Sequence, residues 1–268
     1  MGRFIWCGRE AALPFQVEEM DLRLYSVEEL CCFIYDNLSL IDEGFVDRRL
    51  LDFIRDELGL DDLYERLVQI PLPDEQDAAL FLILQATGYH TEQELNQFQE
   101  RLQWRKKKTP QEKLKEKADI LFDRRRYNTA VRAYKALLTE GPEGSMTEGF
   151  YESAKESLAN AYGHLSQFGN AERVLSELYT ETGSERILKK LYEVCQLSGD
   201  PFPQERYQKY EDRFEAWDRD YREKTETVMA DIEDAPVLRA FSGKEQDART
   251  ALREYVEAKK EEYRSMLE

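Results

Sequence analysis

The chain has 268 residues, of which 41% are hydrophobic and 12% aromatic, so it can build a sizeable core and is not a disordered polymer. Glycine (13 residues) and proline (8 residues) are few, and the helix-forming residues Leu, Glu, Lys, Arg, Gln and Ala are common. The sequence has no run of 18 apolar residues, so we expect no membrane partner. This composition predicts an all-α fold.

The net charge of −17 is distributed unevenly along the chain. Residues 1–103 contain 8 arginines, no lysine and 22 acidic residues, for a net charge of −14. The net charge is +8 over residues 104–135 and −11 over residues 136–268. Lysine first appears at Lys106, which predicts a domain boundary or a long connecting helix there. We therefore expect three parts: an acidic N-terminal helical domain (1–103), helical repeats (104–202) and a C-terminal helical hairpin (203–268).

The N-terminal part has clear signals for where its elements begin and end. Alternating apolar residues in the segments 15–17 and 22–25 predict a short hairpin or extended arm. The capping box at residues 26–29 then begins a helix that Gly44 ends. Further helices are expected over about 45–58, over 60–70, from a cap at Asp74 to Gly88, and over 91–104. The run 78–84 is apolar on all sides, which predicts the central helix of this part.

Residues 109–112 carry a strong signal for the start of a helix. Thr109 is the expected cap, Pro110 occupies the first helical position, and the Glu112 side chain is expected to accept a hydrogen bond from the backbone N–H of the cap. This helix start opens a pattern of small and apolar residues: Leu114, Ala118, Leu121, Tyr127, Ala130, Tyr134, Leu137 and Pro142. This pattern resembles the tetratricopeptide repeat, in which two antiparallel helices occupy about 34 residues. The resemblance implies that Ala118 and Ala130 lie where the two helix axes approach each other most closely.

A second copy of the pattern follows at Leu158, Ala159, Tyr162, Phe168, Ala171, Leu175 and Leu178. Ala171 comes 41 residues after Ala130, and the Gly- and Pro-containing segment 141–149 predicts a longer loop that accounts for the excess. A third copy is weaker, because Gln204 stands where the close-packing alanine belongs. The resemblance covers about residues 109–200. Two good copies fall short of the roughly three repeats that are needed for stability. We therefore expect flanking helices to supply the missing packing against the ends of the repeats.

The C-terminal part is expected to be a hairpin of two long helices, one over about 204–232 and one from Ser242 onward. The first carries five aromatic residues at steps of three and four, which we call the aromatic seam: Tyr207, Tyr210, Phe214, Trp217 and Tyr221. Two interpretations are open. The seam packs on the end of the repeats, or it is a surface for a homodimer or another partner.

Motifs for catalysis, metal binding and nucleotide binding are absent from the sequence, including HExxH, DxDxDG, GxGxxG, GxxxxGK[ST] and GxSxG. We therefore expect no cofactor, no metal, no catalytic residue and no enzyme activity. Cysteines 7, 31, 32 and 195 form no CxxC pair, which favours buried, reduced thiols in a cytoplasmic protein. His90 precedes a helix start, and a surface or capping role is expected for it.

The basic residues 105–108 and 124–126 are open to three interpretations. Nucleic acid is not expected as a partner, because the acidic flanking segments repel phosphate. The basic residues either pair internally with the acidic N-terminal part, lie solvated at the junction, or attract an acidic peptide.

In the resembled family, some members hold the terminal carboxylate of a peptide with Lys and Asn on the concave face. Lys115 and Asn160 occupy matching positions, and Asp119 and His164 lie beside them. For His164 plain solvent exposure is the alternative. The resemblance thus implies an adaptor or scaffold that binds a protein or peptide partner through these four residues. The alternatives are an enzyme with a thiol site around Trp6, Cys7 and Cys31, and a structural protein that self-assembles through the aromatic seam.

Overall fold

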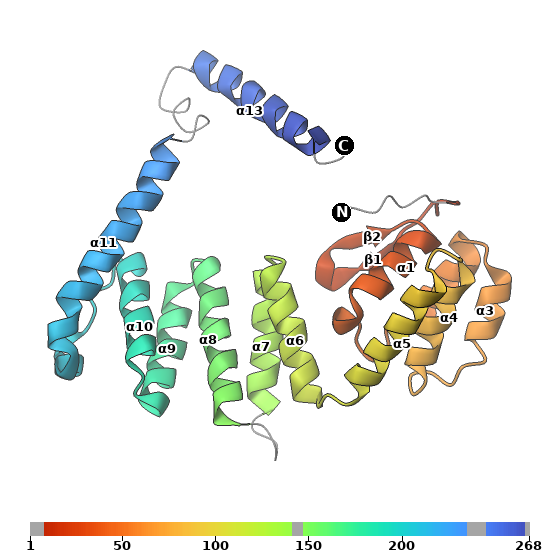
Figure 1. Cartoon of the computed structure of the whole chain (residues 1–268), viewed down its shortest axis with the longest axis horizontal. Helices are drawn as coiled ribbons and strands as arrows, with labels where there is room; N and C mark the ends of the chain where they lie inside the picture. Colours follow the sequence, from red (N-terminus) through yellow and green to blue (C-terminus); the bar gives the residue numbers. More distant parts are fainter. Residues whose placement is uncertain (1–7, 141–146, 235–244, 266–268) are drawn as a thin grey trace. The chain divides into compact units, whose positions relative to one another are not determined.

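The computed structural model of the chain describes residues 8–140, 147–234 and 245–265. Contacts group these residues into two compact units, one ending at Gly183 and the other beginning at Ser184 (Figure 1). The first unit contains β1 (Phe15–Val17), β2 (Leu22–Leu24), α1 (Val27–Asp36), α2 (Arg48–Asp52), α3 (Asp61–Leu67), α4 (Gln76–Ala86), α5 (Glu92–Lys106), α6 (Pro110–Asp123), α7 (Tyr127–Glu140), α8 (Glu148–His164) and α9 (Phe168–Thr182). The second contains α10 (Glu185–Ser198), α11 (Glu211–Asp234) and α13 (Glu245–Ser265). The all-α fold class is confirmed.

The predicted hairpin is present: β1 and β2 pair antiparallel, with Phe15 opposite Leu24. Both of these side chains are buried in the core of the N-terminal part. The apolar helix expected at its centre is α4, which packs against α1, α3 and α5. Four of its side chains have no exposed area: Ala79, Leu80, Ile83 and Leu84.

Several helix boundaries differ from the prediction. The helix expected to end at Gly44 ends at Asp36 and is followed by a 3-10 helix, Leu38–Leu40, and the helix expected over 60–70 ends at Leu67. The helix expected from residue 45 begins only at Arg48, because the Asp47 side chain caps it by accepting a hydrogen bond from the backbone N–H of Leu50 (3.0 Å). The predicted cap at Asp74 is wrong, since α4 begins at Gln76. The Gln76 carboxamide accepts hydrogen bonds from the backbone N–H groups of Gly44 and Val46, which ties the start of α4 to the preceding loop.

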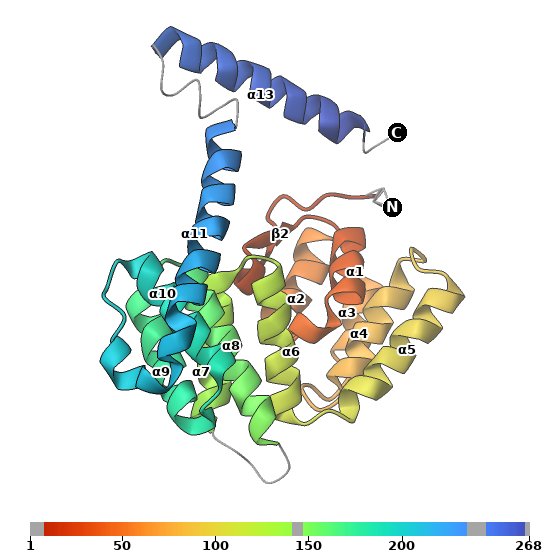
Figure 2. The ribbon, with the colours of Figure 1, turned by 60° about the vertical axis from the view of Figure 1, so that its left-hand side comes forward.

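Helices α6 and α7 pack along each other, α8 and α9 do the same, and α7 also packs on α8 (Figures 1 and 2). The predicted capping box at the start of α6 is present, with Thr109 and Glu112 exchanging hydrogen bonds of 3.2 and 2.8 Å. The four alanines expected at the closest contacts are buried: Ala118, Ala130 and Ala171 have no exposed area and Ala159 has 2%. Helix α9 ends at Gly183, whose φ of 60° is one that a residue with a side chain rarely adopts.

Among the basic residues 105–108 and 124–126, internal pairing with the acidic N-terminal part is found for Arg105 and Lys106, whereas residues 124–126 are exposed. Lys117, which lies between the two groups, also pairs with the N-terminal part. The ammonium group of Lys117 on α6 lies 2.7 Å from Glu19 and also donates to Asp42, and the Lys117 side chain is only 8% exposed. Near the end of α5, Arg105 and Lys106 lie 3.9 and 3.4 Å from Asp77. We call the Lys117–Glu19–Asp42 cluster the Lys117 junction.

In the second unit, the middle of the aromatic seam packs on α10. Phe214 and Trp217 are each 6% exposed, and their rings lie 5.5 Å from Phe202 and 5.9 Å from Tyr192, respectively. Burial and the hydrogen bond from the Tyr192 hydroxyl to Asp218 (3.1 Å) raise the pKa of Tyr192 to about 12.

The single helix expected from Gln204 is interrupted. Residues Gln204–Tyr210 form a 3-10 helix with a non-helical φ of −124° at Tyr207, and α11 begins at Glu211. The hairpin of α11 and α13 stays a prediction, as do the three predicted domain ranges. No helix in the described ranges combines the length and the apolar character needed to cross a bilayer.

We expect Ala118→Leu to destabilise the first unit by about 1–3 kcal/mol, because three further carbon atoms must fit between helices already in contact. Ala136→Leu on the exposed side of α7 is the matched control and should change the free energy of unfolding by less than about 0.5 kcal/mol. Urea denaturation of both variants tests this. Equal stabilities would show that α6 and α7 are not closely packed at Ala118.

We expect Lys117→Met to weaken the first unit, because it keeps the aliphatic stem but leaves two carboxylates facing each other without a cation. Breaking a buried ion pair costs about 3–5 kcal/mol, and the partial exposure of Glu19 and Asp42 (39% and 61%) reduces the expected loss to about 1–2 kcal/mol. The control is Lys135→Met on the exposed face of α7. A midpoint of urea denaturation as high for Lys117→Met as for the control would contradict a stabilising junction.

Candidate functional site

The four residues implied by the repeat resemblance lie on α6 and α8, two helices of the first unit that contact each other. Lys115 and Asp119 are one turn apart on α6, and Asn160 and His164 are one turn apart on α8. We call these four side chains together the repeat face.

The carboxylate of Asp119 is held from two sides. Its Oδ2 accepts a hydrogen bond from Lys115 Nζ (2.8 Å), and its Oδ1 accepts one from the Tyr134 hydroxyl (2.6 Å). Tyr134 is 1% exposed, and burial together with the neighbouring Asp119 raises its pKa, so the hydroxyl remains protonated and continues to donate. The result is a fixed carboxylate beside a lysine whose side chain is 18% exposed.

Lys115 therefore does not present an uncompensated charge. An ammonium group has three donors, so Lys115 can bind a further acceptor while it keeps its hydrogen bond to Asp119. In the sequence, Tyr134 is one of the apolar positions of the repeat pattern, and no local signal indicates a partner for its hydroxyl. Its hydroxyl becomes relevant once α7 is placed beside α6.

His164, the residue of the repeat face at the end of α8, packs against two aromatic side chains. Its ring stacks on Tyr127 with a centroid distance of 4.5 Å and an interplanar angle of 3°. Phe122 meets the same His164 ring edge to face at 5.3 Å. These rings come from the ends of α6 and α8 and the start of α7, so they connect three helices. His164 is exposed to solvent, which is one of the two alternatives expected for it, and its ring packs against Tyr127 and Phe122. Its role in lining a groove stays a prediction.

Asn160 lies one turn before His164 and is exposed. A carboxamide offers both donors and an acceptor, which suits it to the N–H and C=O groups of a peptide backbone. The repeat face thus offers an amide, a shared ammonium group, a fixed carboxylate and a stacked imidazole. All four groups can form hydrogen bonds to a polar ligand.

The other histidine contradicts its prediction. His90 is 7% exposed and is neither a surface nor a capping residue, since Thr91 caps α5. Its ring stacks on Tyr35 at 4.5 Å and meets Tyr89 edge to face at 5.1 Å. The sequence signal missed this burial, because the aromatic partner from α1 is 55 residues away in the chain.

The thiols of the alternative enzyme hypothesis are only partly described, since Trp6 and Cys7 lie outside the described residues. Cys31 has no exposed area, and its thiol donates to the backbone oxygen of Ile83 (3.4 Å). Burial raises the pKa of Cys31 to about 12, which opposes formation of the nucleophilic thiolate. Cys31 therefore has the properties of an unreactive core thiol. Among the described residues, no group of three or more His, Cys, Asp or Glu side chains is arranged to hold a metal ion.

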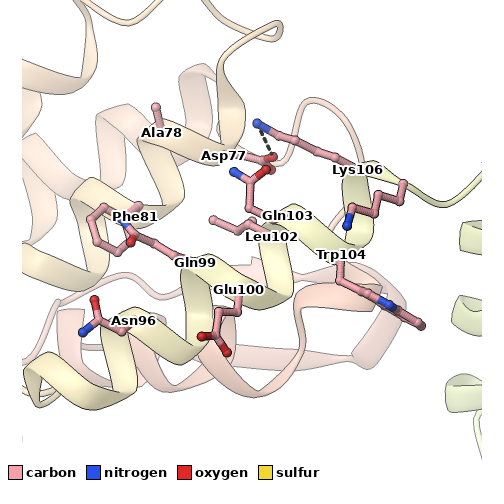
Figure 3. A pocket seen from close by; sticks show the side chains of 11 residues that line it. Asp77, Ala78, Phe81, Asn96, Gln99, Glu100, Leu102, Gln103, Trp104 and Lys106 are labelled. Carbon is pink, nitrogen blue, oxygen red and sulfur yellow. Dashed lines mark ion pairs between the residues drawn. The ribbon is translucent and has the colours of Figure 1, made fainter.

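A second polar surface lies on α4 and α5 (Figure 3). It is an open hollow of about 920 Å³ between the exposed face of α5 and the start of α4. Figure 3 shows Gln99 and Gln103 on the side of α5 that faces α4, and Glu100 and Trp104 on its other flank. Trp104 is 61% exposed, and Lys108 Nζ lies 3.7 Å from the centroid of its ring.

Comparison of the chain with models of protein families, with curated proteins and with solved structures finds no match in any of the three. The arguments for function therefore come from the residues themselves.

We expect Cys31 to be alkylated much more slowly than Cys32 when the folded chain is treated with iodoacetamide at pH 8. Cys32 is only half-buried, whereas Cys31 is buried with a raised pKa. Mass spectrometry of tryptic peptides would measure both rates, with the chain in 8 M urea as the control in which the difference disappears. Rapid alkylation of Cys31 in the folded chain would revive the thiol-enzyme alternative.

Proposed function

We propose that the chain is a cytoplasmic adaptor or scaffold protein whose helices α6–α9 form a short array resembling tetratricopeptide repeats. In this proposal a peptide or protein partner binds on the repeat face. The observation that carries the proposal is the ordered set of polar side chains on α6 and α8, held by buried or half-buried aromatic residues of α7. Side chains already fixed in position lose little conformational entropy on binding, which favours recognition.

The chemistry of the repeat face suggests what part of a partner it binds. Asn160 can bond both polar groups of a peptide unit, and Lys115 adds a donor for a carbonyl or a carboxylate oxygen. Because Asp119 stays beside Lys115, a partner carboxylate there is attracted less strongly than by an isolated lysine. We therefore favour recognition of a peptide backbone with a few polar anchors over recognition of charge alone.

The test places a photo-crosslinking amino acid at position 160 on α8 or at position 177 on α9 of the full chain in living cells. We expect a discrete protein adduct from position 160 and none from position 177, because Glu177 is exposed but does not lie on the repeat face.

A matched pair of variants then tests the chemistry against the partner identified by its adduct. Truncation at an interface anchor costs more than about 1 kcal/mol, so Asn160→Ala should weaken binding at least fivefold, while Glu177→Ala should leave it unchanged. Equal adducts from both positions, or full affinity of Asn160→Ala, would count against the repeat face as a binding site.

A further inference from the structure

We propose that three arginines in the turn between α6 and α7 bind an acidic segment of the partner that occupies the repeat face. We call Arg124, Arg125 and Arg126 together the arginine turn. This inference rests on the proposed function, because the acidic segment belongs to the same partner. The position of the turn, its uncompensated charge and its small size support it.

The arginine turn lies beside the repeat face. Phe122 precedes the turn and Tyr127 follows it, and the rings of both contact the His164 ring, at centroid distances of 5.3 and 4.5 Å. Because the residues on both sides of the turn contact His164, the turn itself lies next to the end of α8. In Figure 1 the α6–α7 and α8–α9 turns lie at the same edge of the first unit. A partner bound at Asn160 and His164 can therefore reach the arginines in the same pose.

The backbone of the turn is closed by its own hydrogen bonds. The N–H of Arg125 donates to the C=O of Phe122 (2.9 Å). The N–H of Arg126 donates to the C=O of Leu121 (2.8 Å). Neighbouring Cα atoms are about 3.8 Å apart, so the three arginine side chains begin within about 8 Å of one another. Long side chains that begin so close together can converge on one group of carboxylates.

The charge of the arginine turn is not compensated by its neighbours. The three side chains are exposed, and in the part of the chain that the structure describes none of them forms an ion pair or a side-chain hydrogen bond. Asp123 is the single acidic residue in 120–131, and 161–171, around the α8–α9 turn, contain none, so the net charge of these two segments is +2. The charged residues next in the chain are Arg132, Glu172 and Arg173, and they raise it to +3.

The carboxylates of the N-terminal part that come near this end of α6 already have cations of their own. Glu18 and Glu19 line a hollow together with Leu121, which precedes the turn by three residues. Glu19 lies 2.7 Å from Lys117, and Glu18 lies 3.3 Å from Arg49. These two carboxylates therefore do not neutralise the arginine turn.

A short acidic peptide segment fits this patch better than a polyanion does. A guanidinium group can bind a carboxylate through two parallel N–H donors, so arginine recognises a carboxylate by geometry as well as by charge. A nucleic acid or an anionic membrane extends over a larger surface and would meet the N-terminal part, whose net charge is −14 over residues 1–103. At Lys115 the fixed Asp119 weakens the attraction for carboxylates, so the acidic residues of the partner are drawn to the arginine turn instead.

The experiment uses the full chain and two pools of fluorescein-labelled ten-residue peptides. In the acidic pool the central residues are Glu-Asp-Glu, in the control pool they are Gln-Asn-Gln, and the flanking residues are varied and uncharged in both. We expect fluorescence anisotropy to show binding of the acidic pool, and binding of the control pool to be at least about tenfold weaker. The affinity for the acidic pool should also fall as the salt concentration rises. Equal binding of both pools, or binding of neither, would overturn the proposal.

Variants of the arginine turn then locate the binding. We expect Arg124→Gln with Arg126→Gln to lower the affinity for the acidic pool about tenfold. The matched control, Arg66→Gln with Lys135→Gln, removes two positive charges from exposed side chains of α3 and α7 and should leave the affinity unchanged. Arg125 has a φ of 60°, which suits glycine, so Arg125→Gly should weaken binding without lowering the midpoint of urea denaturation. Unchanged affinity in the double variant of the turn would contradict the proposal.

Two results separate this proposal from the proposed function. If the adduct from position 160 forms equally with and without Arg124→Gln and Arg126→Gln, the repeat face keeps its partner and the arginine turn has no part in binding. If position 160 gives no adduct while the acidic pool binds through the arginines, the proposed function fails and the turn remains a site for acidic peptides.

Polyanions give the last comparison. The probes are a 20-nucleotide single strand and vesicles of phosphatidylserine and phosphatidylcholine. We expect neither to bind the full chain, because the acidic N-terminal part repels an extended anion. Binding of either probe that is lost in Arg124→Gln with Arg126→Gln, without binding of the acidic pool, would assign the turn to a polyanion and overturn the proposal.

Discussion

The close approach of paired helices at alanine side chains is the constraint on which the repeat region depends. At Ala118 on α6, Ala130 on α7, Ala159 on α8 and Ala171 on α9, a bulkier side chain would hold the helix axes apart. Because these contacts fix how far α6 and α8 stand from their partners, they also fix where the side chains of the repeat face lie. A shift of about one ångström between packed helices is enough to spoil such a preorganised site.

Opposite charges join the repeat region to the rest of its unit. The acidic N-terminal part meets the basic segment at the Lys117 junction and around Asp77. Lys117 lies next to Ala118 in the chain, so the same turn of α6 packs on α7 and bonds to the N-terminal part. A short stack of helix pairs leaves the side of its first helix without a packing partner, and here the N-terminal part packs on α6. Two good copies of the pattern can therefore form a stable unit.

The first unit carries two polar surfaces with different characters. The repeat face is small, and aromatic residues hold its polar groups in place. The surface on α4 and α5 is broader, and its lining combines apolar, amide and charged side chains of both signs. Both surfaces present hydrogen-bond donors and acceptors to solvent.

The sequence by itself determined most of the helices, the β1–β2 hairpin and the burial of the four alanines. Caps, helical spacing and small residues are local signals, and each extends over only a few positions of the chain. Only the tertiary structure decided which distant groups meet: Lys117 with Glu19 and Asp42, His90 with Tyr35, and Tyr134 with Asp119. It also decided that α4 begins at Gln76, since the loop bonds of that side chain outweigh the local capping signal of Asp74. Contacts between residues far apart in the chain depend on how helices pack, and helical periodicity carries no information about their partners.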